Sequence, residues 1–129
     1  MTDDKLILTP FTKALASLES ILTREEDEVV REANIQRFEY TYELAWKMLK
    51  RHLQWSGTDT GSWDFKEVMR EAARVKLIDD AEVWFEYRRA RNQTSHTYEK
   101  KTAQEVYEVA KKFAADARKL LTELEKHHG

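Results

Sequence analysis

Apolar residues recur at alternating intervals of three and four along two long segments, residues 29–55 and 102–124. In the first segment the repeating positions are Ile35, Phe38, Tyr42, Ala45 and Leu49, with Trp46 and Leu53 broadening the face. In the second they are Ala103, Val106, Ala110, Phe113, Ala117, Leu120 and Leu124. This spacing gathers apolar side chains on one face of an α-helix. Both segments are therefore predicted to be long amphipathic helices, long enough to offer a surface for dimerisation.

The same spacing predicts three shorter helices. Their apolar positions are Phe11, Ala14, Leu15, Leu18, Ile21 and Leu22 in the first, Phe65, Val68, Met69 and Ala72 in the second, and Val83, Trp84 and Tyr87 in the third. The first begins near Thr9 and Pro10, Ser62 caps the second, and a capping box of Thr102 and Glu105 opens the last long helix. We therefore predict an all-α fold, an antiparallel bundle of four or five helices forming one domain over residues 1–129.

Composition and charge narrow the class of protein. The absence of cysteine excludes a disulfide framework and a thiolate metal site, and suits a reducing cytoplasm. The formal net charge is −2, so any contact with phosphate is expected to be local. The apolar run at residues 6–8 is too short for a signal peptide, and no segment resembles a membrane span. We expect a cytoplasmic protein without membrane contact.

Few residues suggest a catalytic or metal-binding role. The sequence has neither a glycine-rich phosphate loop nor histidines at metal-binding spacing, so neither a cofactor nor a metal is predicted. His52 is expected at the surface or partly packed, and His127 and His128 at a fraying terminus. Glu39 and Glu43 lie one helical turn apart, and surface ion pairs are the expected use of that spacing.

The stretch RRARNQTSHTYEKK, residues 88–101, connects two predicted helices and concentrates positive charge. It holds five basic side chains and one acid, Glu99, which gives a local charge of +4. A guanidinium group can hold two phosphate oxygens, and imidazole can transfer a proton near neutral pH. Arg91 and His96 are thus candidates for phosphodiester chemistry, and Tyr98 follows two residues later. A solvated connection would explain part of this charge.

Two blocks of the sequence, RNQTSHTY and IQRFEYTYELAWKMLK, resemble HEPN-domain proteins, in particular the nucleotidyltransferase substrate-binding branch. The resemblance implies a helical bundle that forms a homodimer and works with a separate minimal nucleotidyltransferase. It implies that Arg91 and His96 cleave RNA without metal, as in toxin members of that family, and that the partner modifies Tyr98. Asn92 matches the polar residue common after the motif arginine. Arg88, Asn92, Lys100 and Lys101 are expected to contact RNA or a nucleotide.

The reaction implied by the resemblance sets a requirement on assembly. Metal-free cleavage uses the 2′-OH of RNA as the nucleophile, so the protein must supply a base, an acid and positive charge. One chain holds one motif histidine, whereas a two-fold dimer supplies two His96 and two Arg91. Two alternatives remain open: a non-catalytic subunit that binds a nucleotide or substrate for the nucleotidyltransferase, and a structural helical dimer.

Overall fold

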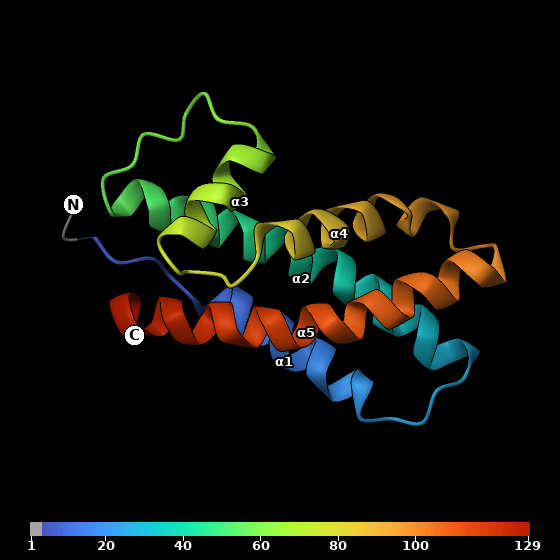
Figure 1. Cartoon of the computed structure of the whole chain (residues 1–129). Coiled ribbons are helices and arrows are strands. Elements are labelled where there is room, and N and C mark those ends of the chain that lie inside the picture. Colours follow the sequence, from blue (N-terminus) through green and yellow to red (C-terminus); the bar gives the residue numbers. More distant parts are fainter. Residues whose placement is uncertain (1–3) are drawn as a thin grey trace.

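The computed structural model describes residues 4–129, which form five α-helices, one short 3₁₀ helix and no strand (Figure 1). The helices are α1 (Thr9–Leu22), α2 (Glu28–Trp55), α3 (Phe65–Arg74), α4 (Ala81–Asn92) and α5 (Lys100–His128). The 3₁₀ helix, η1 (Thr94–His96), lies between α4 and α5. The prediction of an all-α bundle is confirmed.

The helices α1, α2 and α5 pack along one another, α4 lies against α2 and α5, and α3 packs mainly on α4 (Figure 1). Consecutive helices α1 and α2 are antiparallel, as are α4 and α5, whereas α2 and α5 run in the same direction. The C-terminal ends of α2 and α5 therefore meet at one end of the bundle. The α1–α2 and α4–α5 links lie together at the opposite end.

The repeating apolar positions predicted for the two long helices are all buried. Phe113 of α5 is at the centre of this core, with its ring centroid 5.2 Å from Phe38, 5.8 Å from Trp84 and 5.4 Å from Tyr87. All three pairs meet edge to face, the arrangement that aromatic rings prefer. The Phe113 ring thus joins α2, α4 and α5. On α4, Phe85 is buried and the predicted Val83 is only partly so.

The predicted helix starts are less accurate than the helices themselves. Asp64, not Ser62, caps α3, and it forms a reciprocal capping box with Glu67. The box predicted from Thr102 and Glu105 is wrong, because the Ala103 N–H already donates to the Glu99 carbonyl at 2.9 Å. Thr102 therefore lies inside α5, which begins at Lys100. The cap of α1 is Leu8, which makes no side-chain hydrogen bond to the helix.

The structure corrects the predictions for three histidines. His52 is 6% exposed and His128 is 8% exposed, so neither is a surface residue, and α5 continues through His127 to His128 without fraying. The His128 Nδ1 accepts a hydrogen bond from the Leu6 N–H at 3.1 Å, and its Nε2 lies 2.9 Å from His52 Nδ1. A neutral His128 therefore carries its proton on Nε2 and donates it to His52. This chain ties α2, α5 and the N-terminal segment together.

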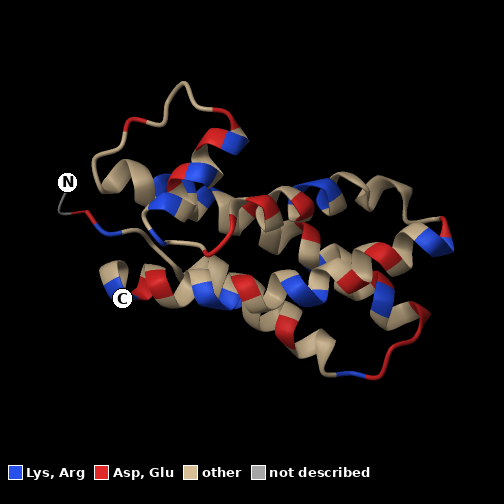
Figure 2. Cartoon of the chain, viewed as in Figure 1, with Lys and Arg blue, Asp and Glu red and all other residues tan. Residues whose placement is uncertain are grey.

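Acidic and basic residues are interspersed along the helices (Figure 2). Some of them pair between helices, as do Lys112 and Glu86 at 3.4 Å and Arg118 with Glu19. Among residues 4–129, no helix has both the length and the apolar character needed to cross a membrane.

Candidate functional site

The charged stretch 88–101 is mostly helical and is not an open loop. Its first residues form the last turn of α4, η1 follows, and Lys100 opens α5. Two threonine hydroxyls hold the turn: Thr94 Oγ1 donates to the Arg91 carbonyl at 2.8 Å, and Thr97 Oγ1 donates to the Thr94 carbonyl at 3.1 Å. The His96 N–H also donates to the Gln93 carbonyl at 2.9 Å. These bonds fix the backbone on both sides of His96.

The turn presents two of the predicted site residues to solvent side by side. The ring centroids of His96 and Tyr98 lie 6.2 Å apart, and the rings meet edge to face. His96 is exposed, and Tyr98 is 79% exposed, an unusual position for a large aromatic residue. Both functional groups are thus accessible to a ligand, an RNA chain or another protein.

Arg91 is anchored to α2 by two carboxylates. Its Nε donates to Glu43 Oε1 at 2.8 Å, and its Nη2 lies 3.8 Å from Glu39 Oε1. The predicted use of Glu39 and Glu43 in surface ion pairs is confirmed. Such partly exposed pairs stabilise a fold by only about 0–1 kcal/mol, so their main effect is to orient the guanidinium. They also offset the Arg91 charge, and the local excess of positive charge is smaller than the sequence count of +4 suggests.

The predicted site residues line two different hollows. Arg88, Arg91 and Asn92 line a small one between α2, α3 and α4, with a volume of about 180 Å³. Tyr98, Lys100 and Lys101 line a larger one of about 1090 Å³ between α2, η1 and α5. His96 lines neither of them. Within one chain, the structure therefore does not bring all the predicted residues into one pocket.

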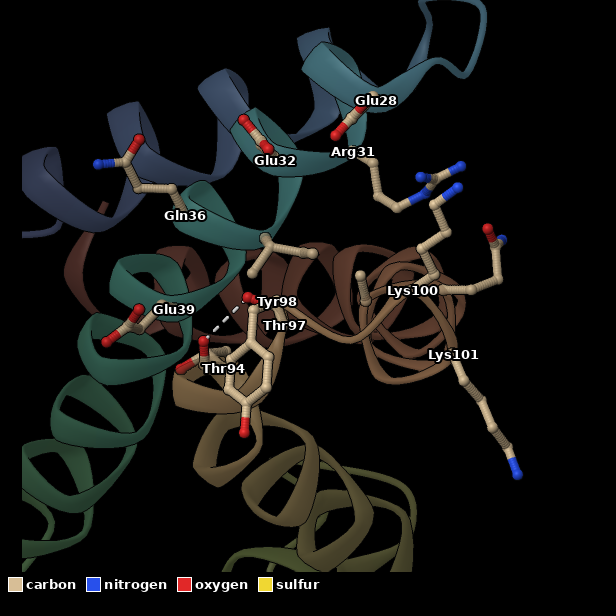
Figure 3. A pocket seen from close by; sticks show the side chains of 13 residues that line it. Glu28, Arg31, Glu32, Gln36, Glu39, Thr94, Thr97, Tyr98, Lys100 and Lys101 are labelled. Atoms are coloured by element: carbon tan, nitrogen blue, oxygen red, sulfur yellow. Dashed lines mark hydrogen bonds between the residues drawn. The ribbon is translucent and has the colours of Figure 1, made fainter.

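The walls of the larger hollow differ in charge. Glu28, Glu32 and Glu39 project from α2, while Lys100 and Lys101 project from the start of α5 (Figure 3). Tyr98 lies between these two groups, on the η1 side (Figure 3). These carboxylates were not predicted as site residues. Their spacing along α2 was visible in the sequence as a polar stripe, but nothing in that stripe indicated which helix it would face.

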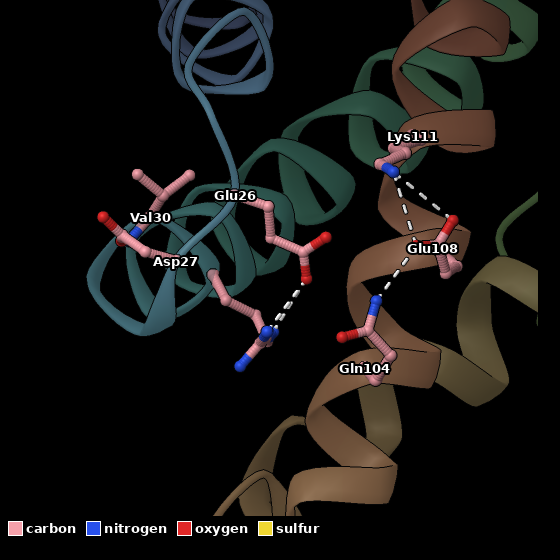
Figure 4. A network of polar contacts seen from close by, with 7 residues as sticks. Glu26, Asp27, Val30, Gln104, Glu108 and Lys111 are labelled. Carbon is pink, nitrogen blue, oxygen red and sulfur yellow. Dashed lines mark hydrogen bonds and ion pairs between the residues drawn. The ribbon is translucent and has the colours of Figure 1, made fainter.

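Polar contacts fix the start of α2, which forms one wall of this hollow. Asp27 Oδ1 accepts from the Val30 N–H at 2.8 Å, and Glu26 Oε2 accepts from Arg31 Nη2 at 2.9 Å and from its Nε at 3.1 Å (Figure 4). On α5, Glu108 accepts from Gln104 and from Lys111 (Figure 4). Arg31 also lines the hollow. Across residues 4–129, no three histidine or acidic side chains are grouped so as to hold a metal ion.

Comparison with known proteins connects this geometry to named relatives. The family model described as nucleotidyltransferase substrate binding protein like matches residues 6–126. A Haemophilus influenzae protein named probable ribonuclease HepT is 37% identical over 139 aligned residues, which span 96% of this chain and 95% of that protein.

Two solved structures share the fold. One, from Haemophilus influenzae, is described as revealing the fold of a substrate binding domain of a nucleotidyltransferase; it has a TM-score of 0.87 and 35% identity over 92% of this chain and 99% of that one. The other, from Thermus thermophilus, has a TM-score of 0.79 and 32% identity over 88% of this chain and 98% of that one.

Proposed function

Because the chain belongs to the nucleotidyltransferase substrate binding protein like family, we propose that it is a metal-independent endoribonuclease regulated by a minimal nucleotidyltransferase partner. The observation that carries the proposal is the α4–η1–α5 turn. Arg91, just before this turn, is held by Glu39 and Glu43 of α2, and the turn leaves the rings of His96 and Tyr98 accessible. The relative named a probable ribonuclease, which aligns with 96% of the chain, supports RNA as the substrate.

The reaction assigns one role to each motif residue. One His96 takes the proton from the 2′-OH of RNA, and the 2′-oxygen attacks the adjacent phosphorus. A second His96, protonated, gives a proton to the departing 5′-oxygen. Arg91 stabilises the charge on the non-bridging oxygens in the transition state. Glu43 occupies Arg91 Nε and Glu39 lies 3.8 Å from its Nη2, so Nη1 is left to face the phosphate. The products are a 2′,3′-cyclic phosphate and a 5′-hydroxyl.

Because the reaction needs one His96 as a base and a second as an acid, it requires a homodimer. Each chain supplies one His96, and the base and the acid are needed on opposite sides of one phosphate. A two-fold axis near η1 places two His96 and two Arg91 around one cleft. Light scattering should find a dimer at micromolar concentration, and a monomer that cleaves RNA at full rate would contradict the composite site.

Tyr98 is the proposed point of control by the partner. Its hydroxyl attacks the α-phosphorus of a nucleoside triphosphate held by the nucleotidyltransferase, and pyrophosphate leaves. The attached nucleotide adds bulk and negative charge close to His96, whose ring centroid is 6.2 Å from that of Tyr98, and so repels the RNA phosphate.

Modification of Tyr98 is tested with the cognate nucleotidyltransferase, ATP and magnesium. Mass spectrometry should find one or more added nucleotides, and peptide mapping should locate them on Tyr98. Tyr98→Phe should abolish the labelling, while Tyr40→Phe, which alters another exposed tyrosine, should not. Labelling that persists in Tyr98→Phe would separate this residue from regulation.

A second candidate function has specific support. The larger hollow of about 1090 Å³ and the family description favour a non-catalytic subunit that presents a nucleotide or substrate to the nucleotidyltransferase. In that case Lys100 and Lys101 bind the ligand without cleaving it. The purified chain would then leave RNA intact and instead change the rate of its partner.

Incubation of the purified chain with RNA and a chelator separates the two functions. A ribonuclease of the proposed type cleaves the RNA in the presence of EDTA, and the fragments end in 2′,3′-cyclic phosphate. A DNA strand of the same sequence is the matched control, because it lacks the attacking 2′-OH and should remain intact. Cleavage that requires magnesium would refute the proposed mechanism.

A further inference from the structure

The small hollow between α2, α3 and α4 contains features that the cleavage reaction does not use. Trp46 and Phe65 form aromatic walls, with their ring centroids 5.6 Å apart. The Arg88 guanidinium lies 4.4 Å from the centroid of the Phe65 ring. Glu43 and Asn92 add an acceptor and an amide. Arg91 also lines this hollow, so the hollow adjoins the proposed catalytic group.

Tyr42 gives this hollow an unsatisfied polar group. The side chain is 2% exposed, and its hydroxyl is buried without a hydrogen-bond partner among the described residues. Burial raises the pKa of Tyr42 well above its ordinary value, against the nearby positive charges of Arg88 and Arg91. The hydroxyl therefore remains a neutral donor. A buried donor without a partner costs free energy, and a bound ligand that accepts its hydrogen bond would remove that cost.

The size of the hollow limits the ligand. A cavity of roughly 150 Å³ accommodates a benzene-sized ring, so about 180 Å³ suits one planar ring system rather than a whole nucleotide. The lining also favours a base over a phosphate group. Phosphate oxygens only accept hydrogen bonds and would meet the Glu43 carboxylate, whereas a base edge both donates and accepts. Aromatic side chains stack on the faces of unpaired bases.

We propose that this hollow binds one unstacked RNA base beside the cleaved phosphate. The Trp46 ring and the Arg88 guanidinium, which covers the Phe65 ring, contact its face, and the Tyr42 hydroxyl, the Asn92 amide and the Glu43 carboxylate contact its edge. This base pocket gives the enzyme a nucleotide preference next to the bond that it cuts. The inference rests on the proposed function, since it names a specificity subsite for the same RNA substrate.

Calorimetry with small probes tests the base pocket without requiring catalysis. The intact protein is titrated separately with AMP, GMP, CMP, UMP and ribose 5-phosphate, which is the same ligand without a base. At least one nucleotide should bind about tenfold more tightly than ribose 5-phosphate, because stacking of one base has that effect or more.

Two substitutions should reduce this difference. Tyr42→Phe should weaken binding of the preferred nucleotide by about tenfold, the effect of one hydrogen bond in a dry site. The affinity for ribose 5-phosphate should stay the same. The stability of this variant should be unchanged or higher, because the lost hydroxyl has no partner in the described protein. Tyr40→Phe is the matched control on the same helix, and it should bind like the wild type. Trp46→Ala should also weaken nucleotide binding while leaving ribose 5-phosphate unaffected.

Several outcomes would overturn the inference: no nucleotide binding at millimolar concentration, equal binding of ribose 5-phosphate, or a Tyr42→Phe protein that binds like Tyr40→Phe. Its failure is distinguishable from failure of the proposed function. If RNA is cleaved but Tyr42→Phe keeps the wild-type preference for the base at the cut, the base pocket is wrong and the ribonuclease stands. If nucleotides bind as predicted and RNA is not cleaved, the pocket stands without the enzyme.

Discussion

The buried pair His52 and His128 should make the protein less stable in acid. Burial, together with the charges of His127 and His128, lowers the pKa of His52 from 6.5 to about 4. The pKa of His128 is lowered as well, first by burial and then by His127 and Lys5. Protonation of His52 places a second proton in the 2.9 Å contact between its Nδ1 and His128 Nε2, which already holds one. The folded state therefore resists a proton that the unfolded chain accepts.

The sign and the size of the change in unfolding free energy follow from the linkage between folding and proton binding. Since the folded pKa is lower than the unfolded one, the contribution of His52 is complete above about pH 6.5 and is lost as the pH falls toward about 4. At about 1.36 kcal/mol per pH unit, lowering the pH to 5 should remove about 2 kcal/mol of unfolding free energy. Protonation of His128 would also break the hydrogen bond to the Leu6 N–H, because the acceptor is His128 Nδ1.

Urea unfolding at pH 7.5 and pH 5, at one fixed protein concentration, measures this loss. His52→Asn places an amide oxygen near the Nδ1 position and does not titrate, so it should lose clearly less stability between the two pH values than the wild type. His96→Asn removes an exposed histidine outside the pair and should retain the full wild-type pH dependence. Equal pH dependence in the wild type and in His52→Asn would refute the reasoning.

Two further predictions concern the site and the core. Glu43→Ala should lower the rate of RNA cleavage by about 10- to 100-fold, because Arg91 loses the acceptor that orients it. Glu43→Gln keeps an oxygen acceptor and should retain most of the activity. Single-turnover cleavage rates measure both effects. Phe113→Ala should lower the free energy of unfolding by about 3–5 kcal/mol, because it leaves a cavity where α2, α4 and α5 meet, and chemical denaturation measures the loss.

The sequence predicts the helices well because each depends on a pattern repeated many times within one segment. Phe38, Ala45 and Phe113 fall on buried faces whatever the neighbouring helix is. A helix start depends on one or two residues with close competitors. Thr102 could cap a helix, but the turn at residues 97–99 begins α5 before it.

The spacing of residues within one segment could not predict contacts between distant segments. His52 and His128 are 76 residues apart, and they meet because α2 and α5 run in the same direction. Arg91 pairs with carboxylates on α2 for a similar reason, since α4 packs on that helix. The motif spacing predicted Arg91 as a site residue. Its orientation by Glu43 and its position beside Tyr42 depend on tertiary packing.

The rate of RNA cleavage by four proteins in EDTA tests most directly whether His96 and Arg91 cleave RNA. The four proteins are the wild type, His96→Ala, Arg91→Ala and Gln93→Ala, an exposed position in the same turn, all verified as folded by circular dichroism. His96→Ala and Arg91→Ala should each lose about 10²-fold or more of the cleavage rate, while Gln93→Ala should cleave like the wild type. Wild-type cleavage by His96→Ala would contradict the proposed role of His96.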